Sequence, residues 1–178
     1  ISNEDFLLEA IIASVMGMVD TLSGEAIDVE DVATASFRFV GGALGSMQAG
    51  YQLALSKAGY MGPNNDTYIA FRGREGRVFW TPTGTPSELH LESMAPKWFT
   101  ASQRTFAYTL PTVEAYGGAY GVRFLEDFIR STLGEGEPPA SGEDALRVAR
   151  IIEAVYRSSE AGQRVDLLRA NGSNTGVR

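Results

Sequence analysis

The first half of the chain alternates between apolar and polar residues, a pattern that predicts strands. The alternation is clearest over residues 27–40. One side carries Ala33, Ala35, Phe37 and Phe39, and the other carries Val32, Thr34, Ser36 and Arg38. A period of two is that of a half-buried strand. Gly41 and Gly42 then indicate a tight turn, so a second strand over residues 43–55 completes a long antiparallel hairpin with one wetter face.

Further strands are predicted on both sides of this hairpin. Residues 7–19 form an apolar segment, which we interpret as a buried strand because it is shorter than the roughly 18 to 20 residues that cross a bilayer. Glu4, Asp5 and Glu9 stand where a signal peptide carries basic residues. Later segments with strand character are 67–72 paired with 77–81, then 89–94, and finally 165–168. Residues 97–116 predict no definite element.

Two amphipathic helices are predicted near the end of the chain. The first, residues 120–133, ends at Gly134 and carries an apolar stripe of Phe124, Leu125, Phe128 and Ile129. The second begins at Ser141, a good N-cap with Asp144 three residues later as a capping box, and ends at Gly162. Its expected buried stripe is Ala145, Val148, Ala149, Ile152, Val155 and Tyr156.

Strands that precede helices favour an α+β fold over alternating βαβ units. We predict a large, mostly antiparallel open sheet with the helices packed on one face. Residues 1–168 are expected to form one domain and residues 169–178 a disordered tail. The chain begins with Ile1 instead of methionine, so we expect it to be a processed or excised piece.

Composition narrows the possible chemistry. The formal charge of −7 argues against a nucleic-acid partner, and the one arginine-rich segment, 72–77, is interpreted as a solvated hairpin turn. The absence of cysteine excludes disulfides and thiolate ligands. His90 is the single histidine and no G-x-S-x-G or G-x-G-x-x-G motif is present, so we assign no catalytic, cofactor-binding or metal-binding residue.

Three segments in register resemble one enzyme family. They are Val29–Gly45, Gly73–Val78 and Ser141–Gly162. Their order and spacing are similar to the C-terminal domain of the glucose–fructose oxidoreductase / inositol dehydrogenase (Gfo/Idh/MocA) family, over about residues 5–168.

The resemblance implies a parent enzyme with a missing N-terminal Rossmann domain that binds NAD or NADP. Such enzymes transfer a hydride to or from sugars, inositols and related polyols, and use a lysine, an aspartate and a histidine that would all lie upstream of this chain. Lys97 and His90 are not their counterparts, so the chain alone is expected to be inactive. The resemblance places substrate contacts at Tyr60 and, secondly, at Trp98.

Two hypotheses therefore stand. In the first, the chain is the substrate-binding and oligomerisation domain of an NAD(P)-dependent sugar or polyol oxidoreductase, forming a homodimer or homotetramer through the sheet face. In the second, it is a non-catalytic dimerisation module whose open sheet face meets a second copy. That face is expected to carry Thr34, Ser36, Ser46, Gln48 and Gln52. A cytoplasmic location without membrane association is expected in either case.

Overall fold

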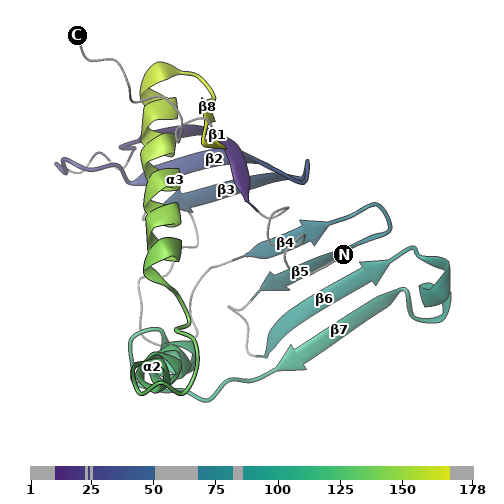
Figure 1. The fold of residues 1–178 in the computed structure, drawn as a ribbon. Coiled ribbons are helices and arrows are strands. Elements are labelled where there is room, and N and C mark those ends of the chain that lie inside the picture. Colours follow the sequence, from purple (N-terminus) through teal and green to yellow (C-terminus); the bar gives the residue numbers. More distant parts are fainter. Residues whose placement is uncertain (1–10, 23, 25, 51–67, 82–85, 169–178) are drawn as a thin grey trace, which may run out of the picture. The chain divides into compact units, whose positions relative to one another are not determined.

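A computed structural model of the chain describes residues 11–22, 24, 26–50, 68–81 and 86–168. The chain divides into two compact units (Figure 1). The first comprises Ile1–Ala54 and Ala140–Arg178, and the second comprises Leu55–Pro139. The predicted tail and the end of the second hairpin strand lie outside the described residues.

The first unit is a four-stranded sheet of order β3-β2-β1-β8 with one helix, α3. Its elements are β1 (Ile12–Asp20), β2 (Val32–Phe39), β3 (Leu44–Gly50), α3 (Gly142–Ala161) and β8 (Val165–Asp166). All three pairings are antiparallel. Gly42, at φ 87°, makes the predicted turn between β2 and β3, where its amide donates to the carbonyl of Phe39 at 3.0 Å.

The core of this unit lies between α3 and the sheet. Val15, Ala35, Ala154 and Val155 are buried together, and Phe37 packs against them. The predicted alternation of β2 is confirmed, because Ala35 is buried while Ser36 and Arg38 are exposed. Apolar residues at every second position of a strand lie on the same face of the sheet. In the first unit, α3 covers this face.

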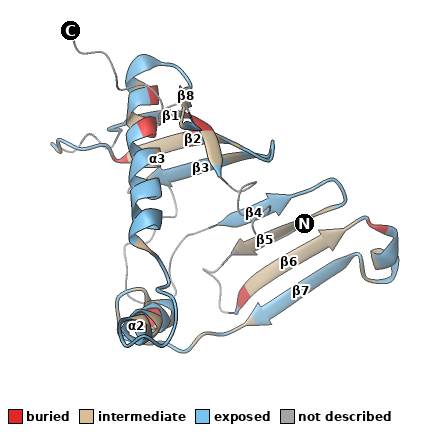
Figure 2. Cartoon of the chain, viewed as in Figure 1, coloured by how far each residue is buried: buried red, intermediate tan, exposed pale blue. Residues whose placement is uncertain are grey.

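The buried residues of α3 lie near its C-terminal end, so most of the predicted stripe is exposed (Figure 2). Val155 is buried, but Val148 and Ile152 are 55% and 51% exposed. The buried positions are Ala154, Val155 and Ser158. Periodicity identifies the apolar side of a helix, but the sheet of this unit reaches only its C-terminal half.

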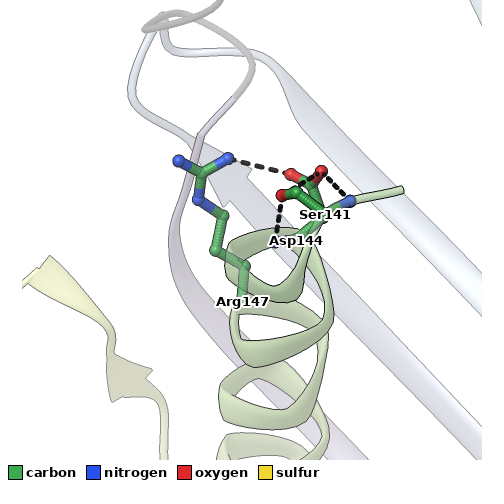
Figure 3. Close-up of polar contacts among 3 residues, drawn as sticks. All are labelled: Ser141, Asp144 and Arg147. Atoms are coloured by element: carbon green, nitrogen blue, oxygen red, sulfur yellow. Dashed lines mark hydrogen bonds and ion pairs between the residues drawn. The ribbon is translucent and has the colours of Figure 1, made fainter. Parts of the chain in front are cut away.

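The ends of α3 are as predicted. Ser141 is the N-cap and shares a reciprocal capping box with Asp144, whose other carboxylate oxygen accepts from Arg147 at 3.1 Å (Figure 3). Gly162 ends the helix at φ 61°, in the left-handed region that glycine adopts without a steric penalty.

The second unit is another antiparallel four-stranded sheet, of order β4-β5-β6-β7, with α2. Its elements are β4 (Ile69–Arg72), β5 (Gly76–Thr81), β6 (Ser87–Ser93), the 3-10 helix η1 (Pro96–Ala101), β7 (Gln103–Tyr108) and α2 (Gly118–Thr132). The α+β class and the antiparallel pairing are confirmed, with the described strands divided between two sheets. The unassigned region 97–116 contains most of η1 and all of β7.

Candidate functional site

Trp98 lies in η1, at one end of the second sheet. Its backbone amide donates to the carbonyl of Ala95 at 2.8 Å, and the guanidinium carbon of Arg104 lies 4.4 Å from its ring centroid. A cation over an indole face is attracted by the ring quadrupole. Arg104 therefore holds one face of the indole, and the side chain is half-buried.

A cavity of about 380 Å³ adjoins Trp98. Its lining is apolar at Phe71, Val78 and Leu91. Charged side chains also line it, namely Glu75, Arg77, Glu92 and Lys97. Apolar surface with a few polar groups is the usual composition of a small-molecule site. Tyr60, the other predicted substrate contact, lies outside the described residues, so its position relative to Trp98 stays a prediction.

A second aromatic group joins β5, β7 and α2. The indole nitrogen of Trp80 donates to the Tyr108 hydroxyl at 2.5 Å, and the hydroxyls of Tyr108 and Tyr120 lie 3.2 Å apart. The rings of Trp80 and Tyr120 meet edge to face, with centroids 6.3 Å apart. Burial, assisted by the Tyr108 hydroxyl, raises the pKa of Tyr120 to about 12, so this phenol is neutral at physiological pH.

This group borders a cavity of about 410 Å³ lined by Ile69, Phe71, Val78, Trp80, Leu89 and Tyr108. This aromatic group was not predicted from the sequence. The strand register is what brings these aromatic residues together. Trp80 is paired with Leu89 and Tyr108 with Ser87, so both aromatic side chains lie on one face of the sheet. That register is known only once the hairpins are paired.

His90, in β6, contacts three side chains of the second sheet. Its Nε2 lies 3.0 Å from a carboxylate oxygen of Glu88, and its Nδ1 lies 3.2 Å from the hydroxyl of Thr105. Phe79 stacks on the imidazole with ring centroids 4.5 Å apart. Both ring nitrogens and one face of His90 are thus engaged by neighbouring side chains of the sheet.

The first sheet presents an open face, opposite the face that α3 covers. Register places Met16 beside Ser36 and Ser46, and Met18 beside Thr34 and Gln48. These side chains surround a shallow cavity of about 400 Å³. Met18 is 67% exposed. Four of the five predicted polar residues of this face are confirmed in place, whereas Gln52 lies outside the described residues.

Within the described ranges, no group of three or more histidine, cysteine, aspartate or glutamate side chains could hold a metal ion. No helix in that part of the chain is long and apolar enough to cross a membrane.

Known structures share this fold. Levoglucosan dehydrogenase in complex with NADH and L-sorbose is 23% identical, with a TM-score of 0.68 over 88% of this chain and 45% of that one. An aldose-aldose oxidoreductase from Caulobacter crescentus complexed with glycerol is 20% identical, with a TM-score of 0.60 over 92% and 44%. An oxidoreductase from Agrobacterium radiobacter, in complex with NAD⁺, L-tartaric acid and magnesium, is 21% identical, with a TM-score of 0.68 over 90% and 44%.

The chain spans less than half the length of each of these proteins. No curated protein matched it. Among protein families, residues 5–167 match the C-terminal α/β domain of an oxidoreductase family. Because this match covers nearly the whole sequence, the chain belongs to the Gfo/Idh/MocA oxidoreductase family and carries its C-terminal α/β domain.

Proposed function

We propose that the chain is the substrate-binding and oligomerisation part of an NAD(P)-dependent oxidoreductase that acts on a sugar, an inositol or a related polyol. The family match over residues 5–167 carries this proposal. It is supported by the complexes of levoglucosan dehydrogenase with NADH and of the Caulobacter enzyme with glycerol. In this proposal residues 1–168 act as one domain, the parent is cytoplasmic, and a Rossmann domain outside this chain binds the cofactor.

In this proposal the cofactor carries out the hydride transfer, and residues of this chain orient the substrate. A nicotinamide cofactor, when bound by the parent, supplies or accepts the hydride. Trp98 would contribute an aromatic wall that orients the ring of the substrate, held in place by Arg104. Tyr60 is proposed as the second contact. Orientation of the reacting carbon lowers the entropic part of the barrier, so these residues affect catalysis without exchanging a proton.

The test compares this chain with a longer protein that includes the upstream coding sequence. We expect NADH fluorescence to show no saturable binding to the 178-residue chain and saturable binding to the longer protein. Turnover of a polyol by the chain alone, or an upstream sequence without a glycine-rich dinucleotide motif, would contradict the proposal.

Trp98 is tested in the longer protein. We expect Trp98→Ala to raise the KM for the polyol at least about tenfold while the affinity for NADH is unchanged, since aromatic contacts of this kind are worth about 1 to 3 kcal/mol. The neighbouring substitution Phe99→Ala is the matched control, because Phe99 is 72% exposed. If the two substitutions raise the KM equally, Trp98 is not a substrate contact.

The alternative is a non-catalytic dimerisation module. The specific observation in its favour is the open face of the first sheet, where Met16 and Met18 are exposed among polar side chains of β2 and β3. Self-complementary faces of this type form isologous dimers.

A further inference from the structure

Three arginines of the β4–β5 hairpin line one cavity. Arg72 ends β4, Arg74 lies in the turn, and Arg77 is the second residue of β5. The hairpin is closed by a hydrogen bond from the amide of Gly73 to the carbonyl of Gly76 at 2.8 Å. The cavity measures about 370 Å³. Three arginines thus line one cavity in a chain whose net charge is −7.

One of the three is already paired. Arg77 donates from Nε and Nη2 to the two carboxylate oxygens of Glu92, at 2.7 and 2.9 Å. The pKa of Glu92 is lowered by this hydrogen bond with Arg77, so the pair stays ionic. A bidentate pair is geometrically fixed. Arg77 and Glu92 therefore form a rigid wall of the cavity.

The net charge of the side chains that line this cavity is positive. Glu92 is the one carboxylate among the residues that line this cavity, against three arginines, which leaves an excess of two positive charges. Glu75, in the same turn, lines the neighbouring cavity with Lys97 instead. Ser93, Ser102 and Gln103 complete the polar lining. These groups can donate hydrogen bonds to oxygen.

From this arrangement we propose that the arginine cavity, lined by Arg72, Arg74 and Arg77, is a binding site for a phosphate group. Guanidinium groups recognise phosphate oxygens through paired N–H donors. A phosphate monoester carries about −1.5 to −2 charges at neutral pH, which equals the excess on the cavity lining. The volume lies at the lower end of the roughly 300 to 1,000 Å³ typical of ligand sites, so it admits a phosphate with a small attached group.

The phosphate site does not depend on the proposed oxidoreductase function, because it needs neither the cofactor nor Trp98. Every residue that it uses belongs to the second unit of this chain. Arg77, Glu92 and Ser93 also line the cavity beside Trp98, whereas Arg72 and Arg74 line the arginine cavity alone. The phosphate could belong to a phosphorylated small molecule or be the free ion, and the two sources share the same chemistry.

The experiment is calorimetric titration of the full chain, at low ionic strength, with inorganic phosphate, glucose 6-phosphate, glucose and succinate. We expect saturable binding of at least one phosphate compound, no binding of glucose, and weaker binding of succinate. The Arg72→Gln/Arg74→Gln variant should bind at least about tenfold more weakly, because hydrogen bonds to charged groups are each worth about that factor.

The matched control is Arg123→Gln/Arg147→Gln, which removes the same charge from two exposed arginines on α2 and α3. It should change the affinity by less than about twofold, since neither Arg123 nor Arg147 lines the cavity. Tighter binding of glucose 6-phosphate than of phosphate would assign the site to a phosphorylated molecule, and equal binding would assign it to the phosphate ion.

Three outcomes would overturn the proposal. They are no saturable binding by the unaltered chain, equal weakening in both double variants, and succinate binding as tight as that of the phosphate compounds. Equal weakening would mean that net charge alone drives association. Both substituted arginines of the cavity are exposed, and circular dichroism of each variant verifies that it is folded.

Discussion

At the scale of single residues, Ser158 and Gly17 allow α3 and β1 to pack closely and to share a hydrogen bond. Short β8 pairs with β1 only at Ser14 and Val15, so the edge of β1 beyond them needs other partners. The Ser158 hydroxyl accepts from the amide of Gly17 at 2.9 Å and donates to the carbonyl of Gln163 at 2.6 Å. A side chain at Gly17 would bring its Cβ within 2.8 Å of Val155, which explains the glycine in the strand.

We expect Ser158→Ala to lower the free energy of unfolding by about 1 to 3 kcal/mol, because it leaves a buried amide without its acceptor. Ser158 is 0% exposed. Ser159→Ala is the matched control: its hydroxyl accepts from the amide of Val19 at 3.1 Å in a part-buried position that water can reach. Ser159→Ala should therefore lower the free energy of unfolding by less than Ser158→Ala does. Urea denaturation measures both, and an equal or smaller loss for Ser158→Ala would contradict this account.

At the scale of elements, the start of α3 shows how three side chains set a helix boundary. Asp144 accepts from the amide of Ser141 at 3.0 Å and from its hydroxyl at 2.8 Å, while its own amide donates to the Ser141 hydroxyl at 3.1 Å. These bonds satisfy donors that the first turn of a helix leaves unpaired. They lower the pKa of Asp144 from its ordinary value of 3.8, with Ser141 as the main cause and Arg147 as a lesser one.

A carboxylate with a lowered pKa stabilises the fold above pH 3.8, and that contribution is lost as the pH falls through the lowered value. We expect Asp144→Asn to be less stable than the unaltered chain at pH 6, and the difference to shrink as the pH falls below 3.8. Denaturation at a series of pH values measures this. Glu143→Gln, in the same turn but outside this network, should show a smaller difference; a constant deficit for Asp144→Asn at all pH values would contradict the linkage.

At the scale of the whole molecule, each of the two units exposes a different kind of surface to binding partners. The first unit covers one face of its sheet with α3 and leaves Met16 and Met18 on the other. Exposed methionines among small polar residues are adaptable contact surface. The second unit carries the arginine cavity and the Trp98 cavity at the same end of its sheet, so the two proposed ligands would be bound by one scaffold.

If the open face forms the oligomer, Met18→Glu should convert it to a monomer, because a carboxylate would be buried against its symmetry mate. Light scattering at micromolar concentration measures the mass. Met94→Glu is the control, since Met94 is 79% exposed and belongs to the second unit. A chain that is monomeric before substitution, or a dimer that survives Met18→Glu, would exclude this face as the interface.

Local patterns predicted much of the fold. The β2–β3 turn at Gly42, the hairpin at Gly73, and the capped ends of α3 depend on interactions between residues a few positions apart, which the sequence shows directly. The family assignment likewise follows from the order of such segments. By contrast, β7 was not predicted, because its polar and apolar residues become a strand only through pairing with β6.

What the sequence determined by itself is the α+β class, the caps of α3, the hairpin turns at Gly42 and Gly73, the apolar side of β2, and the family. Only the tertiary structure decided which half of α3 is buried, that Trp80 and Tyr120 join Tyr108, that Arg104 holds Trp98, and that Arg72, Arg74 and Arg77 line one cavity. The reason is physical: backbone preferences act over a few residues, whereas burial and side-chain pairing depend on strand register between segments far apart in the chain.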